Sequence, residues 1–125
     1  MDIYAENILD HNKNPRHHGK IEDASVAFKG SNPLCGDKIE VELKVDEKGI
    51  IEDAAFVGAG CAISRASTSM LMDEIIGKPL TYIDELTSEQ VFEIMGIPLT
   101  GTRIKCALLS LDVIKRAAEK YVQNR

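Results

Sequence analysis

The chain has 125 residues, of which 28% are charged and 44% hydrophobic, and its formal net charge is -5. It is long enough to bury a core, so we expect residues 1–125 to form a single domain. No apolar run approaches the roughly 20 residues that a membrane helix needs, and no basic block suggests nucleic-acid binding. The acidic start, from Met1 to Glu6, has no hydrophobic signal-peptide region. We therefore expect a cytoplasmic protein that binds neither a membrane nor nucleic acid.

The first half of the chain predicts one helix and three strands. Apolar and charged side chains alternate strictly from Lys38 to Val45, which predicts a strand with one buried and one wet face. A turn at Asp46–Gly49 leads into another strand, where Glu52 and Asp53 interrupt the alternation and predict a bulge. The predicted elements are a helix that ends at Asn14-Pro15 and strands over residues 26–28, 38–45 and 50–57.

The second half predicts helices. The stretch from Ile63 to Ile76 lacks Gly and Pro and ends at Gly77, and Thr87–Gln90 fits a capping box for a helix through Met95. An apolar stripe predicts a last helix from about Ile104 to Tyr121. A three-stranded antiparallel sheet with one wet face needs helices on its other face. The predicted fold class is therefore α+β, with helices packed on one face of that sheet.

Three cysteines and one aspartate occur where loops meet regular elements. Cys35 and Asp37 lie two residues apart before a strand, and Cys61 follows Gly-Ala-Gly. Cys106 lies in the first turn of the last predicted helix. Three cysteines cannot all pair within one chain, and thiolates and carboxylates bind metal ions. We therefore predict that these four residues converge on one metal site. No CxxC pair occurs, so three unrelated buried cysteines are the alternative at this point.

Four motifs carry a resemblance that covers nearly the whole chain. The sequence resembles the IscU/NifU-type scaffolds on which iron–sulfur clusters are assembled. The resemblance implies a SufE/NifU-like fold and a non-enzymatic role in building a labile [2Fe-2S] cluster from iron and sulfur. The motifs are Asp10-His11 with Asn14-Pro15-Arg16, Asn32-Pro33-Leu34-Cys35-Gly36-Asp37, Gly60-Cys61-Ala62-Ile63-Ser64 with Ala66-Ser67, and Lys105-Cys106-Ala107-Leu108-Leu109.

The resemblance also implies roles for the site residues and partners. Cys35, Cys61 and Cys106 would be thiolate ligands and Asp37 the oxygen ligand. An IscS/NifS-like cysteine desulfurase would deliver sulfur as a persulfide, and apo iron–sulfur proteins would receive the cluster. We expect Cys106 to accept the persulfide, because a helix N-terminus and nearby basic residues favour thiolate. We expect Lys105 to support the thiolates of the site by its positive charge. The alternative is that Lys105 is a solvated residue with no role in the site.

Two departures from the family pattern leave other interpretations open. Many members carry His where this chain has Lys105, whereas SufU-type members have Lys with an insertion for which residues 99–103 leave no room. The segment Ile97–Gly101 lacks the Leu-Pro-Pro-Val-Lys motif, so we do not expect a dedicated Hsp70-type chaperone. The alternatives are a SufU-type sulfurtransferase with zinc on the same four residues, and a structural zinc domain. A homodimer is also left open.

Overall fold

The computed structural model describes residues 9–11, 13, 17–32, 37–60, 62–96 and 102–124. Three strands are followed by helices, and residues 9–11 and 13 near the start are also helical. This order confirms the predicted α+β class. The labelled elements, in chain order, are the strands β1 (Val26–Asn32), β2 (Asp37–Val45) and β3 (Ile51–Ala59) and the helices α2 (Ala62–Ile75), α3 (Leu80–Glu85), α4 (Ser88–Met95) and α5 (Thr102–Gln123).

The sheet is antiparallel, and β2 lies between β1 and β3. Lys44 pairs with Asp53 and Val45 pairs with Ile51, so Glu52 is the extra residue of a bulge, as predicted. At the turn between β2 and β3, Asp46 Oδ1 accepts hydrogen bonds from the backbone nitrogens of Lys48 (2.8 Å) and Ile50 (2.9 Å). The aspartate thus fixes the turn from which β3 starts.

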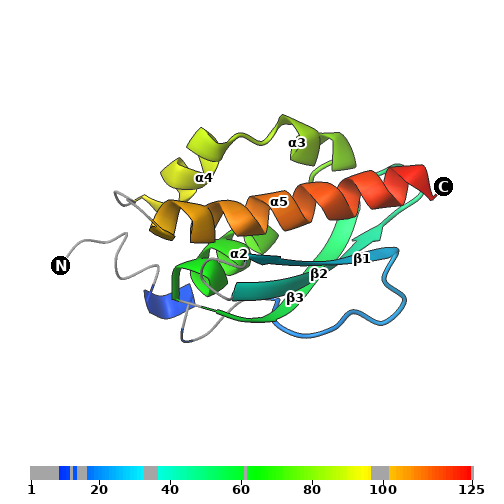
Figure 1. Ribbon diagram of the computed structural model, residues 1–125. Helices are drawn as coiled ribbons and strands as arrows, with labels where there is room; N and C mark the ends of the chain where they lie inside the picture. Colours follow the sequence, from blue (N-terminus) through cyan, green and yellow to red (C-terminus); the bar gives the residue numbers. More distant parts are fainter. Residues whose placement is uncertain are drawn as a thin grey trace.

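The predicted alternation of β2 separates a buried face from an outer one. Ile39, Val41 and Leu43 are buried, whereas the charged residues between them are exposed or half-buried. Residues 17–25 cross the outer face, where they appear as the blue loop below the sheet in Figure 1. In this segment the backbone nitrogen of Ile21 donates to Glu42 Oε1 at 2.7 Å. The face expected to be wet is therefore partly covered by the chain itself.

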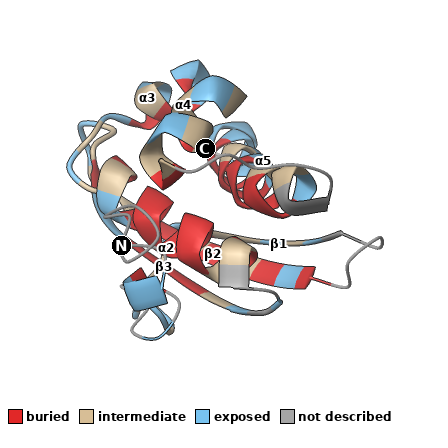
Figure 2. Ribbon diagram, turned by 90° about the vertical axis from the view of Figure 1, so that its left-hand side faces the viewer, coloured by how far each residue is buried: buried red, intermediate tan, exposed pale blue. Residues whose placement is uncertain are grey.

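Helices α2 and α5 cover the inner face, and α3 and α4 pack against these two helices (Figures 1 and 2). The core lies between the sheet and α2 and α5, and Met70 and Met72 of α2 belong to it. Helix α5 is longer than the helix predicted over residues 104–121. It buries Leu109, Val113 and Ala117, because it contacts the sheet on one side and α3 and α4 on the other.

Small side chains let α2 and α5 approach closely. Ala66, Ser67 and Ser110 are almost completely buried. The Ser110 hydroxyl lies 3.1 Å from the Ser67 hydroxyl and donates to the Ala107 carbonyl at 2.7 Å. Each buried hydroxyl therefore has a partner, as burial of a polar group requires.

The capping box of α4 is confirmed, whereas α3 was not predicted. Gln90 N donates to Thr87 Oγ1 at 3.2 Å, and Thr87 N donates to Gln90 Oε1 at 2.9 Å. Gly96 ends the helix with a φ of 73°. Helix α3 has only six residues, and Pro79 at its N-cap makes no side-chain hydrogen bond. It therefore lacks the sequence signals by which a helix start is recognised.

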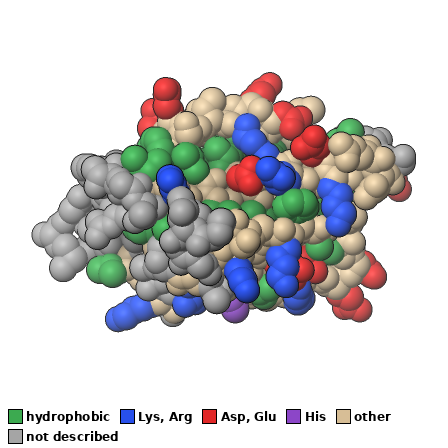
Figure 3. All heavy atoms as spheres, viewed as in Figure 1, with side chains coloured by type: hydrophobic (Ala, Val, Ile, Leu, Met, Phe, Trp, Pro, Cys, Tyr) green, Lys and Arg blue, Asp and Glu red, His purple; other side chains and the backbone are tan. Residues whose placement is uncertain are grey.

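None of the helices in the described part of the chain is long and apolar enough to cross a membrane. Figure 3 shows basic and acidic side chains interspersed over the face on which α5 lies.

The predicted short strand at residues 26–28 is longer in the structure, because Gly30 does not end it. A Cβ atom built at Gly30 would lie 2.5 Å from Cγ2 of Val113 on α5. Glycine is thus needed where α5 crosses β1, and β1 continues beyond it.

We predict that Gly30→Ala lowers the free energy of unfolding by about 1–3 kcal/mol, because the added methyl overpacks the contact with α5. Urea denaturation followed by circular dichroism measures this. In a Val113→Ala background the same substitution should cost less than about 0.5 kcal/mol, because the clashing atom is gone. An equal cost in both backgrounds would contradict the assigned contact.

Candidate metal centre

Asp37 is the first residue of β2, and its side chain is buried, with a relative exposure of 2%. It pairs across the hairpin with Asn32, the last residue of β1. A buried carboxylate is costly unless it is hydrogen-bonded. The Ser64 hydroxyl, on the first turn of α2, donates a short hydrogen bond to Asp37 Oδ2. The strand and the helix together hold this carboxylate inside the protein.

Gly60 lies against the other oxygen of the same carboxylate. A Cβ atom built at Gly60 would lie 2.6 Å from Asp37 Oδ1 and 2.8 Å from its Cγ. Any larger residue would displace the carboxylate, so glycine is required by this close approach. Gly60 directly precedes Cys61 in the sequence, and Ser64 follows three residues later. The carboxylate is thus contacted on both oxygens by the segment that contains Cys61.

Cys106 lies on α5 and is also buried, with a relative exposure of 4%. Its backbone carbonyl oxygen is 3.5 Å from Ser64 Oγ, the hydroxyl that donates to Asp37. Strand β2 and helices α2 and α5 therefore meet at Ser64. The structure brings Asp37 and the backbone of Cys106 to one point, although they lie far apart in the sequence.

The prediction that Cys106 lies in the first turn of the last helix was wrong. Helix α5 begins at Thr102, so Cys106 is its fifth residue and lies in the second turn. The field of a helix terminus falls off within its first turn. The helix dipole therefore favours the thiolate form of Cys106 less than the sequence suggested. Lys105 is exposed, and the described structure gives it no partner in the site.

The other two predicted ligands, Cys35 and Cys61, lie outside the described residues, as does the segment Ile97–Gly101. Among the residues that the structure describes, no three His, Cys, Asp or Glu side chains gather around one point. The Asp37 carboxylate and the backbone of Cys106 nevertheless both lie next to the buried Ser64 hydroxyl, and carboxylates and thiolates are donors that bind iron or zinc. Convergence of all four ligands stays a prediction.

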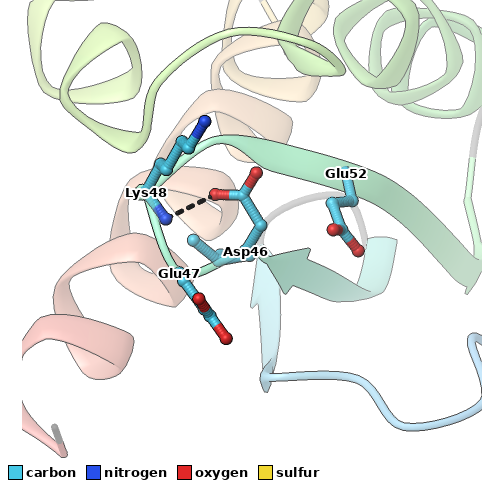
Figure 4. A pocket seen from close by; sticks show the side chains of 5 residues that line it. Asp46, Glu47, Lys48 and Glu52 are labelled. Atoms are coloured by element: carbon cyan, nitrogen blue, oxygen red, sulfur yellow. Dashed lines mark hydrogen bonds between the residues drawn. The ribbon is translucent and has the colours of Figure 1, made fainter.

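The described surface has one acidic hollow that could be mistaken for a metal site. It has a volume of about 410 Å³ and is lined by Val45, Asp46, Glu47, Lys48 and Glu52. Figure 4 shows that the three carboxylates point in different directions. Asp46 moreover uses one oxygen for the backbone of the turn. The hollow therefore follows from the tight turn and is not a converging set of ligands.

Sequence reasoning missed the contacts that tie the N-terminal part of the chain to α2 and β3. His11 Nδ1 lies 2.7 Å from Ser69 Oγ in a buried contact, which ties the N-terminal helical residues to α2. His17 Nε2 lies 2.8 Å from Asp73 Oδ1, and the His18 ring packs edge-on against Phe56. Each contact joins residues far apart in the sequence, so no local pattern could indicate it.

The chain is similar in sequence to proteins of a known family. The family model described as the NifU-like N terminal domain matches residues 3–125. The "Iron-sulfur cluster assembly scaffold protein IscU" of Aquifex aeolicus is 37% identical over 123 residues, which cover 98% of this chain and 78% of that protein. The "Zinc-dependent sulfurtransferase SufU" of Bacillus subtilis is 35% identical over 135 aligned residues, covering 94% of this chain and 90% of that protein.

A crystal structure of the N-terminal part of a NifU-like protein from Brucella abortus has the same fold. The TM-score is 0.78 with 20% sequence identity, and the match covers 98% of this chain and 96% of that one. Sheet, helices and buried polar centre thus define a small α+β domain with its helices on one face of an antiparallel sheet. The chain belongs to the NifU-like N-terminal domain family. The resemblance stated from the four motifs is confirmed.

We predict that Gly60→Ala weakens zinc binding by about tenfold or more, because residues that orient a ligand typically have effects of this size. Competition against a chromogenic zinc chelator measures the affinity. Gly77→Ala is the control, since Gly77 has a φ of 88° and open space around it at the far end of α2. This control should lower stability and leave zinc binding unchanged. Equal zinc affinities of Gly60→Ala and the parent would show that the carboxylate does not bind metal.

Proposed function

We propose that this chain is a scaffold that assembles an iron–sulfur cluster and transfers it to apo acceptor proteins. The observation that supports this most directly is the buried Asp37 carboxylate, held by Ser64 next to the backbone of Cys106. Family membership and relatives named as assembly scaffolds support the same role. The cluster is the cargo of the protein and not a permanent cofactor.

The proposed ligands are Cys35, Cys61 and Cys106 through sulfur and Asp37 through oxygen. Three thiolates hold iron firmly, whereas a carboxylate is a harder donor that exchanges with an incoming thiol more readily. Asp37 is the first residue of β2, so the sheet fixes its backbone and the exchange would need only its side chain to move. We propose a [2Fe-2S] cluster, as the family resemblance implies, and four protein ligands complete the coordination of its two irons.

Sulfur would come from a cysteine desulfurase. The Cys106 thiolate would attack the outer sulfur of the desulfurase persulfide, forming a new S–S bond while the desulfurase thiolate leaves. Conversion of this sulfur to sulfide takes two electrons from an external reductant. Because Cys106 is buried, docking of the desulfurase would have to uncover it. We propose that these steps take place in the cytoplasm.

A zinc-dependent sulfurtransferase is the second candidate, because the Bacillus subtilis relative carries that name. Zinc accepts the same three thiolates and one carboxylate in a tetrahedron. That relative aligns over 135 residues, more than the 125 of this chain, so it contains an inserted segment. The IscU scaffold of Thermotoga maritima aligns over 134 residues, so an insertion does not by itself mark a sulfurtransferase. An experiment that distinguishes bound iron from bound zinc therefore decides between the two candidate functions.

We predict that the protein, reconstituted anaerobically with iron, sulfide and reductant, acquires the visible absorption of an iron–sulfur cluster. The Cys35→Ser, Cys61→Ser and Cys106→Ser variants should each bind less cluster or lose it faster, because oxygen is a poorer ligand for iron than thiolate. Visible spectra with metal analysis measure both. A protein that stays colourless and retains zinc would contradict the scaffold role and favour the sulfurtransferase or a structural zinc domain.

We also predict that Cys106→Ser loses persulfide labelling by a cysteine desulfurase more completely than Cys35→Ser or Cys61→Ser does. Mass spectrometry after a brief reaction with desulfurase and cysteine detects the added sulfur. The two other variants serve as controls for general damage to the site. Labelling of Cys106→Ser at the level of the parent would refute Cys106 as the first acceptor.

A further inference from the structure

Ser64 has the contacts of a residue that controls how Asp37 binds metal. It is completely buried on the first turn of α2, and its hydroxyl donates to Asp37 Oδ2. Hydrogen bonds to a charged oxygen are stronger than those between neutral groups. The hydroxyl therefore occupies one oxygen of the carboxylate before any metal arrives. The other oxygen, Oδ1, faces Gly60, the residue before Cys61.

The same hydroxyl has a second oxygen nearby, but at a longer distance. Ser64 Oγ lies 3.5 Å from the carbonyl oxygen of Cys106, farther than the roughly 2.5–3.0 Å usual for a hydrogen bond between two oxygens. A hydroxyl has a single proton and can turn it toward one acceptor at a time. The proton therefore stays with the nearer acceptor, Asp37 Oδ2, and keeps that oxygen from binding a metal.

We propose that Ser64 is a positioning residue that restricts Asp37 to metal binding through one oxygen and competes with the metal for the carboxylate. The inference rests on the proposed function, because it takes Asp37 as a ligand. A carboxylate bound through one oxygen and drawn back by a hydrogen bond leaves the metal readily. Ser64 would in this way set the rate at which the scaffold gives up its cargo.

The matched control is Ser67, one turn further along the same helix. Ser67 is equally buried, but its hydroxyl contacts the Ser64 carbonyl at 3.1 Å and the Ser110 hydroxyl at 3.1 Å. Ser67→Ala removes a buried hydroxyl from α2 without touching Asp37. Alanine is the best helix-forming residue, so neither variant should disturb α2 itself.

The test uses Co²⁺, whose visible spectrum reports the number of its ligands, and measures its release to excess chelator. Ser64→Ala should release Co²⁺ about tenfold more slowly than the parent, because one charge-assisted hydrogen bond no longer competes. Its visible absorption should fall, since the freed Oδ2 adds a ligand to the tetrahedral ion. Ser67→Ala should stay within about twofold of the parent, because the Ser67 hydroxyl contacts the Ser64 backbone and Ser110 but not Asp37.

The same substitution in an Asp37→Cys background separates a role through Asp37 from a structural one. There Ser64→Ala should change Co²⁺ release by less than about twofold, because no carboxylate is present to be held. Ser64→Thr keeps a hydroxyl and should release Co²⁺ like the parent. Unchanged or faster release from Ser64→Ala, an equal effect in the Asp37→Cys background, or slow release from Ser64→Thr would each overturn the inference.

Cluster transfer to an apo ferredoxin, followed by the circular dichroism of the acceptor, is run in parallel. Ser64→Ala and Asp37→Cys should both transfer more slowly than the parent. A parent that binds Co²⁺ but assembles no cluster would overturn the proposed function, while Co²⁺ release would still decide the role of Ser64. A parent that binds neither would overturn both.

Discussion

Coverage of one face of the sheet by α2 and α5 is the constraint on which the rest of this structure depends. A three-stranded sheet cannot bury its apolar face alone, and the alternation of β2 presents Ile39, Val41 and Leu43 to these two helices. The helices must then approach the sheet and one another closely. Gly30 on β1 and the small side chains of α2 make that approach sterically possible.

Close packing also explains why a polar cluster lies inside an otherwise apolar layer. Ser64, Thr68 and Ser69 are fully buried on α2, and each hydroxyl has a partner. Ser64 and Ser67 lie next to α5, against the Cys106 carbonyl and the Ser110 hydroxyl, so larger side chains at these two positions would push α2 away from α5. Serine fills little space and both hydroxyls have partners, so the helices can stay near each other. The proposed metal centre would use this arrangement, because Asp37 is held at one end of the same interface.

Features set by local chemistry could be predicted from the sequence, and features set by distant contacts could not. The strand at residues 38–45, the bulge at Glu52 and the capping box at Thr87 all depend on residues a few positions apart. The extension of β1 past Gly30 depends on Val113, which lies far along the chain. Ser64 likewise donates its hydrogen bond to Asp37, which lies 27 positions earlier in the sequence. The motifs predicted the ligands of the site, but not the serine that donates a hydrogen bond to Asp37.

Hydrogen bonds at the two edges of the sheet limit how copies of this protein can associate. On the free edge of β3, the backbone of Phe56 exchanges hydrogen bonds with His17 and Gly19 at 3.0 and 2.8 Å. On the free edge of β1, Lys120 Nζ donates to the Ala27 carbonyl at 2.9 Å. Exposed strand edges invite pairing with another chain, which leads to aggregation. At these positions the edge groups are already hydrogen-bonded, which opposes extension of the sheet by a second copy.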